Sequence, residues 1–193
     1  MLNLFLATLM AGTVPQGVLT IKVGEQQVVM DSRKAWTISE YSCGGDRLLL
    51  PLGGQGAVLA DASGQWIGSA MRTEETEPVS ALSVTVDGQD VTLVLPQTLT
   101  GDKVVVSKTS QLATLKHTAQ TTVTREQLVQ CHTFEATAEL PVKSFYAFIY
   151  SLWPEAKHWL AQPLSGELRR GEFNADKGQK PTLAARWLAQ YDP

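Results

Sequence analysis

Two histidines, His117 and His132, are the residues of this chain best suited to acid–base chemistry. An imidazole titrates near neutral pH, so a pair of imidazoles can exchange protons with a substrate. The polar and apolar residues around them alternate, and this pattern predicts that both face the same side of a β-hairpin. Their predicted neighbours on that face are largely apolar, so the alternative is a pair of histidines packed in a core.

A second group of candidates follows in the segment from Trp153 to Trp159. Glu155 is a further candidate acid or base, and His158 could donate a hydrogen bond to a substrate. The rings of Trp153, Trp159 and Tyr146 are candidates for stacking on an apolar ligand face. The alternative is that these tryptophans pack over the edge of the fold.

The hairpin that must position the two histidines can be placed in register from the sequence. Residues Ala113–Val123 alternate between the two faces of a half-buried strand, and a second run covers Gln127–Ala138. If Arg125 and Glu126 form the turn, apolar residues meet on one face and opposite charges pair on the other. The register predicts these pairs: Val123 with Leu128, Ala119 with His132, His117 with Phe134, Leu115 with Ala136, and Lys116 with Glu135, the last as a solvated ion pair.

The rest of the chain is also rich in predicted strands. Asp87-Gly88 indicates a type I′ hairpin turn. Lys143–Leu152 is apolar on both faces, which predicts a central strand covered from both sides. The segment Thr182–Gln190 fits either a strand or a short helix. The other expected strands are Val18–Val23, Gln27–Asp31, Ala35–Ser42, Arg47–Leu50, Gly56–Ala60, Trp66–Met71, Ala81–Val86, Val91–Leu95, Glu167–Phe173 and Leu183–Tyr191.

These strands predict an all-β fold, a large antiparallel β-sandwich with antiparallel pairing throughout. The chain of 193 residues is long enough for one such domain, which we expect over residues 17–193. Tyr191-Asp192-Pro193 looks like a strand that leads into a turn, so we expect a sandwich truncated at its C-terminus.

Composition excludes several classes of function. A net charge of -3 gives no basic surface for nucleic acid. No phosphate-binding loop or zinc-ligand spacing occurs, so the sequence predicts no cofactor and no metal. Cys43 and Cys131 are the only cysteines. They could form one disulfide in an exported protein, and the favoured interpretation is two free, largely buried thiols.

The first residues have the length and apolar character of a signal-peptide core. Leu2–Gly12 is too short to span a bilayer, and the small residues Ala11 and Gly12 at its end could precede a cleavage point. We therefore expect a signal peptide over residues 1–16, and a secreted or periplasmic mature chain without a membrane span. No basic residue precedes Lys22, so a buried first strand or a frayed start of the domain is the alternative.

Four stretches carry a resemblance to a known family. They are KVVVSKTS at Lys103–Ser110, VQCHTFEA at Val129–Ala136, FYAFIY at Phe145–Tyr150 and WPEAKHWL at Trp153–Leu160. Together they resemble the β-supersandwich of galactose-mutarotase-like domains, in particular exported, uncharacterised versions found beside carbohydrate-active proteins. The resemblance covers Gly17–Pro193.

The resemblance implies a sugar-binding concave sheet. Mutarotases use His and Glu side chains on that face to protonate the ring oxygen and deprotonate the anomeric hydroxyl. Many other members are accessory domains of polysaccharide lyases and glycosidases and lack these residues. No position of this sequence matches the mutarotase catalytic pair residue by residue.

Three functions therefore remain open. The first is an extracytoplasmic carbohydrate-binding or carbohydrate-processing accessory domain with a polysaccharide or oligosaccharide partner. The second is an enzyme of mutarotase, polysaccharide lyase or glycoside hydrolase type that uses His117, His132 or Glu155 as acid and base. The third is a structural surface protein. In the first two, the expected site is the face with His117 and His132, rimmed by Trp153, His158, Trp159 and Tyr146.

Overall fold

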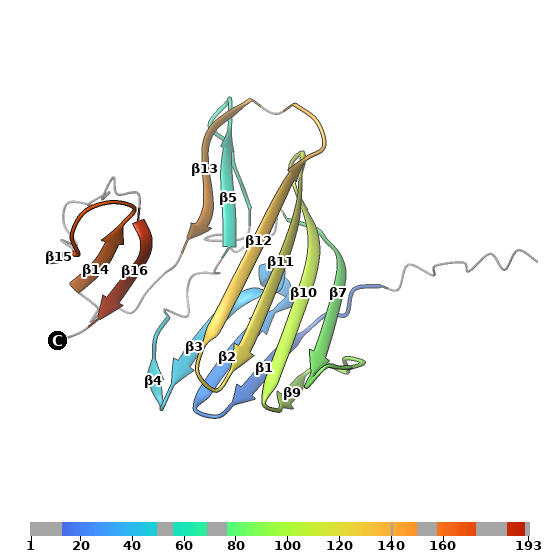
Figure 1. The fold of residues 1–193 in the computed structure, drawn as a ribbon. Coiled ribbons are helices and arrows are strands. Elements are labelled where there is room, and N and C mark those ends of the chain that lie inside the picture. Colours follow the sequence, from blue (N-terminus) through green and yellow to red (C-terminus); the bar gives the residue numbers. More distant parts are fainter. Residues whose placement is uncertain are drawn as a thin grey trace, which may run out of the picture. The chain divides into compact units, whose positions relative to one another are not determined.

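The computed structural model describes residues 13–49, 56–68, 77–139, 141–149, 158–172 and 185–191. The fold is all-β, as the sequence predicts, with a single 3₁₀ turn, η1, at Ser32–Lys34 in this part of the chain (Figure 1). The chain forms two compact units, residues 1–151 and 152–193, which are described separately below. Residues 1–12 of the predicted signal peptide and the end at Asp192-Pro193 lie outside the described residues.

The strands of the first unit are β1 Val18–Val23, β2 Gln26–Asp31, β3 Thr37–Cys43, β4 Asp46–Arg47, β5 Gly56–Asp61, β6 Trp66–Gly68, β7 Val79–Val86, β8 Gln89–Asp90, β9 Gln97–Thr100, β10 Lys103–Leu112, β11 Leu115–Thr124, β12 Leu128–Ala136 and β13 Val142–Ile149. The strands of the second unit are β14 His158–Pro163, β15 Arg169–Glu172 and β16 Ala185–Tyr191.

The first sheet has the order β4-β3-β2-β1-β9. Its β1 and β9 strands run parallel, so the prediction of antiparallel pairing throughout is wrong at this point. The chain leaves this sheet after β4, forms β5 to β8 in other sheets, and then returns beside β1. A long connection of this kind permits parallel pairing, which a tight hairpin turn does not.

The second sheet has the order β12-β11-β10-β7-β8 and contains the predicted hairpin. All of the predicted pairs of β11 and β12 are confirmed, including Lys116 with Glu135. The turn at Asp87-Gly88 is confirmed as well, because both residues have the positive φ of a type I′ turn, 51° and 82°. Strand pairing stops at Asp90, so the predicted strand at Val91–Leu95 is wrong.

The two five-stranded sheets pack as a sandwich. Every second residue of β10 is buried, from Val104 to Leu112. Lys108 reaches the Ala35 carbonyl beside the first sheet, whereas Leu112 packs with Ala57 and Leu59 of β5. Gln26 joins the sheets, since its Nε2 donates to the Thr124 carbonyl at 2.6 Å while its Oε1 accepts from Tyr41. In Figure 1, β7, β10, β11 and β12 pass in front of β1, β2 and β3.

A third sheet, with the order β13-β5-β6, belongs to the same unit. Here β5 is the buried central strand and β13 is an edge strand in the described region. Phe145 and Tyr146 of β13 are both partly exposed, so the predicted central position of this strand is wrong. The apolar run is explained by two half-exposed faces, one of which packs against the hairpin through the contact of Phe145 with Phe134.

The second unit is a small antiparallel sheet with the order β15-β14-β16. Ala185–Tyr191 is a strand, which decides between the strand and helix alternatives for this segment. Trp159 of β14 lies over Gly171 of β15, its cross-strand partner. An indole that covers a strand glycine replaces the side-chain packing that glycine lacks.

The structure also bears on the predicted state of the two cysteines and on membrane spans. Cys43 and Cys131 are both free, but Cys131 is exposed because it lies on the outer face of β12. The expectation of a buried thiol is therefore wrong for Cys131. No helix among the described residues is long and apolar enough to cross a membrane.

Candidate functional site

His117 lies at the centre of a chain of polar side chains inside the first unit. It is an inward-facing residue of β11 and its exposed fraction is 0%. Its Nδ1 lies 2.7 Å from Oε1 of Glu77, and its Nε2 lies 2.9 Å from Nδ1 of His132. A carboxylate only accepts, so Nδ1 of His117 carries a hydrogen and donates it to Glu77.

Glu77 is the acceptor at which three side chains converge. Besides His117, Lys108 Nζ donates to Oε1 at 3.0 Å and Ser110 Oγ donates to the same oxygen at 2.6 Å. Glu77 is only 1% exposed and precedes β7, whereas Lys108 and Ser110 are inward-facing residues of β10. A buried carboxylate is tolerated when a cation and further donors satisfy it, which is the arrangement here.

The ammonium of Lys108 has a second acceptor from the first sheet. Its Nζ donates to the carbonyl of Ala35 at 2.8 Å. Ala35 follows the η1 turn, and both Ala35 and Trp36 adopt positive φ, 50° and 57°. Asp31 caps the start of this turn, because its side chain accepts a hydrogen bond from the Arg33 amide. The carbonyl that Lys108 reaches is that of Ala35, directly after the turn.

His132 forms the outer end of the chain. It is half-buried on the inward face of β12, and its ring stacks on that of His117 with centroids 5.1 Å apart. The pKa of His132 is lowered to about 4, chiefly by burial and in addition by the positive charges of His117 and Lys108, against the opposing effect of Glu77. His132 is therefore neutral at pH 7.

Phe134 completes the packing around the two imidazoles. Its ring stacks on His117 with centroids 4.4 Å apart and meets Phe145 edge-on at 5.0 Å. The histidine pair is thus enclosed by aromatic carbon on one side and by the buried ion pair on the other. The Glu77 carboxylate holds the imidazole of His117 in place, and a substrate cannot reach His117 while the sheet is closed.

The remaining predicted residues lie on other sheets or outside the described residues. His158 and Trp159 lie on β14 of the second unit, where Nδ1 of His158 is 3.8 Å from Oε1 of Glu172. Glu155 and Trp153 lie outside the described residues. In the part of the chain that the structure describes, no three His, Cys, Asp or Glu side chains are arranged to hold a metal ion.

Tyr146 lies on the third sheet and pairs with a residue that the sequence analysis did not select. Its ring centroid is 5.8 Å from that of Trp66, with the planes tilted by 30°. Tyr146 is opposite Val58 and Trp66 is opposite Ala60, so the two rings share one face across β5. Ser144, opposite Ala60, adds a hydroxyl to the same face.

Glu77, Lys108 and Ser110 were not predicted from the sequence as site residues. The period of two in β10 contains a signal for the last two, since both share a face with Val104, Val106 and Leu112. A lysine among buried valines requires a buried partner. Glu77 gives no such signal, because it lies in an irregular segment before Pro78.

A scan of protein-family models, a search of curated proteins and a search of solved structures each give no match to this chain.

Proposed function

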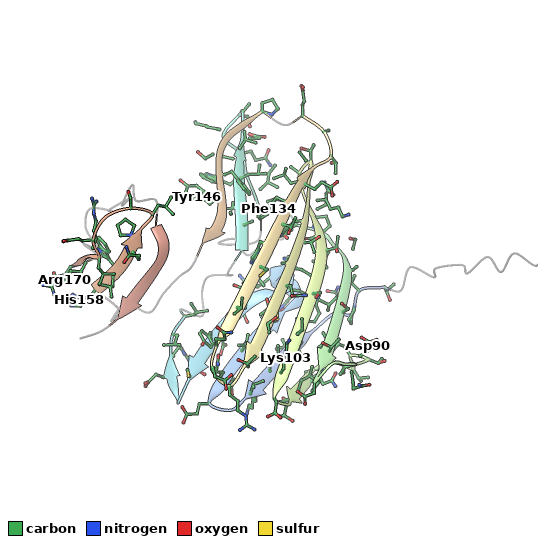
Figure 2. The ribbon with its side chains drawn as sticks, in the orientation of Figure 1. Asp90, Lys103, Phe134, Tyr146, His158 and Arg170 are labelled. Carbon is green, nitrogen blue, oxygen red and sulfur yellow. The ribbon has the colours of Figure 1, made fainter. Side chains whose placement is uncertain are left out.

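We propose that this chain is an extracytoplasmic carbohydrate-binding accessory domain, and that Trp66 and Tyr146 form its sugar-contacting surface. The observation that carries the proposal is the aromatic pair itself, two partly exposed rings on one face of the β13-β5-β6 sheet. Figure 2 labels Tyr146 on β13. Aromatic faces supply apolar contact to the carbon face of a sugar ring.

The surroundings of the pair suit a shallow site. Tyr146 is 39% exposed, while Val58 and Ala60 beneath the rings are buried and hold the platform in place. The hydroxyl groups of Ser144 and Tyr146 can donate to and accept from sugar hydroxyls. This combination of an apolar floor and a few polar groups is common in ligand sites.

The buried chain supports binding over catalysis as the main function. Glu77 and His117 are sealed from solvent and are fully engaged with Lys108, Ser110 and each other. A general acid or base must come within hydrogen-bond reach of its substrate. Because solvent cannot reach them, these two side chains serve to stabilise the fold.

An enzyme of mutarotase, polysaccharide lyase or glycoside hydrolase type is the second candidate. The hydrogen bond from the His117 ring to the half-buried His132 favours it, because a carboxylate–histidine pair behind a second imidazole resembles the arrangement that orients a catalytic base. In this candidate His132 would contact the sugar.

A glycan array followed by calorimetry on the best ligand tests the proposal. Tyr146→Ala and Trp66→Ala should each weaken binding by about tenfold or more, the usual effect of truncating a stacking residue in a binding site. Phe145→Ala is the matched control, because Phe145 has similar exposure, 41%, and faces the opposite side of the same strand. Thermal melts of all three variants test whether each of them folds.

The outcomes distinguish the candidates. Wild-type affinity in the Tyr146→Ala and Trp66→Ala variants would contradict the proposal that this surface binds the sugar. Loss of glycan affinity in Trp159→Ala instead would place the sugar on the second unit. Turnover of a bound glycan that disappears in His132→Gln would favour the enzyme. Fusion of residues 1–16 to a reporter tests export, since a reporter that stays in the cytoplasm with the segment uncleaved would contradict an extracytoplasmic domain.

A further inference from the structure

The hydrogen bond between His117 and His132 requires that their two facing nitrogens hold one hydrogen between them. Nδ1 of His117 holds its hydrogen against Glu77, so Nε2 of His117 and Nδ1 of His132 share one hydrogen between them at 2.9 Å. One added proton keeps this bond, because His117 can then donate from both nitrogens. A second added proton places a hydrogen on each of the two facing nitrogens, and the bond cannot form.

The charges around the pair oppose that second proton. Lys108 of β10 lies on the same carboxylate as His117, and that carboxylate, Glu77, is the anion that the described residues place in the buried chain. Ser110 of β10 and the Ala35 carbonyl near η1 are neutral, and Phe134 of β12 and Phe145 of β13 add only aromatic carbon. Lys116 and Glu135 lie on the outer face of the hairpin, away from the pair. Among the described residues, two imidazolium groups and an ammonium would then face the carboxylate of Glu77.

We propose that the hydrogen bond between His117 and His132 is an acid-sensitive latch, and that a second proton on this pair releases strand β12 from β11. The inference is independent of the proposed carbohydrate function. It rests on the short bond, the burial of His117 and the position of β12 in its sheet.

β12 is the element that such a charge would move. It is the terminal strand of its sheet in the described region, with β11 as its paired neighbour there. Every second residue of β12 is exposed, and its inward residues include His132 and Phe134. Terminal strands with few buried contacts open at lower free energy than central strands such as β10. Opening would expose the His132 ring to water and allow it to charge.

The pKa of His132, lowered to about 4, sets the range in which the latch acts. Above this range the folded protein keeps the neutral ring and the bond to His117. As the pH falls from about 6.5 toward 4, the open form of β12 binds the additional proton before the closed form does, and the open form becomes more populated. The closed hairpin therefore has the lower proton affinity of the two forms, as linkage requires.

Hydrogen–deuterium exchange tests the latch on the full chain. Between neutral pH and a pH near 4, and after correction for intrinsic exchange rates, amides of Leu128–Ala136 should lose protection by about tenfold or more, while those of β10 keep theirs. In His132→Gln, which keeps a hydrogen-bonding side chain without a titrating one, this acid-dependent loss should disappear. His158→Gln is the matched control, because it removes the histidine of the second unit and should leave the loss unchanged.

Three results would overturn the latch: equal acid-dependent exchange in wild type and His132→Gln, no acid-dependent exchange in wild type, or opening of β10 together with β12. If His132→Gln does not fold, ¹⁵N spectra of the imidazoles decide with wild type alone. Protonation of His132 should coincide with the loss of β12 protection. Loss of protection while His132 stays neutral would contradict the proposal.

Discussion

Lys108 Nζ lies 3.0 Å from Oε1 of Glu77 in the interior of the sandwich, with both side chains almost fully removed from water. The lysine comes from the middle of β10 and the glutamate from the residue before Pro78. The pair thus fixes an irregular segment to a regular strand. Removing one partner of such a pair leaves a buried charge without compensation, which costs far more than the loss of an exposed ion pair.

Lys108→Met should destabilise the protein by about 3–5 kcal/mol, because Glu77 loses its counter-charge in a buried site. The double variant Lys108→Met with Glu77→Gln should recover part of that loss, since Gln needs no cation. Urea unfolding of the wild type, both single variants and the double variant measures the coupling. A single variant that unfolds at the wild-type midpoint would contradict this role.

The ion pair between Lys116 and Glu135 should behave differently. Its nitrogen and oxygen are 3.9 Å apart, and the side chains are 52% and 70% exposed. A double-mutant cycle with Ala at both positions should give a coupling of about 0–1 kcal/mol that decreases with added salt. A coupling as large as that of Lys108 and Glu77 would show that the hairpin depends on this surface contact.

Stability should decrease as pH falls from about 6.5 toward 4, in part because of His132. The pKa of His132 is lowered to about 4 in the folded chain and lies near 6.5 in the unfolded one, so the unfolded chain binds the proton first. The contribution is fully present above pH 6.5 and is lost toward pH 4. Because His132 is only half-buried, screening limits it to roughly 1–2 kcal/mol.

Urea midpoints measured across that range in wild type, His132→Gln and His158→Gln isolate this contribution. The slope with pH should flatten in His132→Gln and remain in His158→Gln. Identical slopes in all three proteins would assign the acid sensitivity to carboxylates elsewhere in the chain.

Asp87→Ala should destabilise the protein by about 1–2 kcal/mol. Asp87 has a positive φ of 51°, and its Oδ1 accepts the backbone amides of Asp102 and Lys103 at 2.9 and 2.8 Å. Alanine loses both bonds and tolerates this backbone conformation less well. Asp87→Asn keeps an acceptor and should stay within about 0.5 kcal/mol of wild type in thermal or urea unfolding. An Asn variant as unstable as the Ala variant would assign the effect to charge.

Gly171→Ala should disturb the second unit through Trp159. A Cβ at this position would lie 2.7 Å from Cζ2 of Trp159, closer than van der Waals contact allows, so the indole must move. We expect a loss of about 1–3 kcal/mol and faster proteolysis within residues 158–191. Introducing Trp159→Ala into the Gly171→Ala variant should lower the free energy of unfolding by less than the same substitution does in wild type. Strict additivity would show that ring and glycine do not interact.

The register of the hairpin could be predicted because it is a local property. Side chains alternate at every residue, so a slip by one position would exchange the apolar face of β11 with its threonines. The same alternation puts His117 and His132 on one face of the hairpin, as diagonal neighbours. Asp87-Gly88 was predictable for a related reason, since few residue pairs accept two positive φ values.

The sequence by itself therefore determined the all-β class, the hairpin, and the presence of two histidines on one inward face. Only the tertiary structure decided what those histidines contact. Glu77 is separated from His117 by 40 residues and comes from irregular backbone that carries no periodic signal. The parallel pairing of β1 with β9 and the ring contact between Trp66 and Tyr146 also join distant segments. Pairings of this kind depend on how sheets pack to bury apolar area and satisfy buried polar groups, which is a property of the whole fold rather than of any short stretch of sequence.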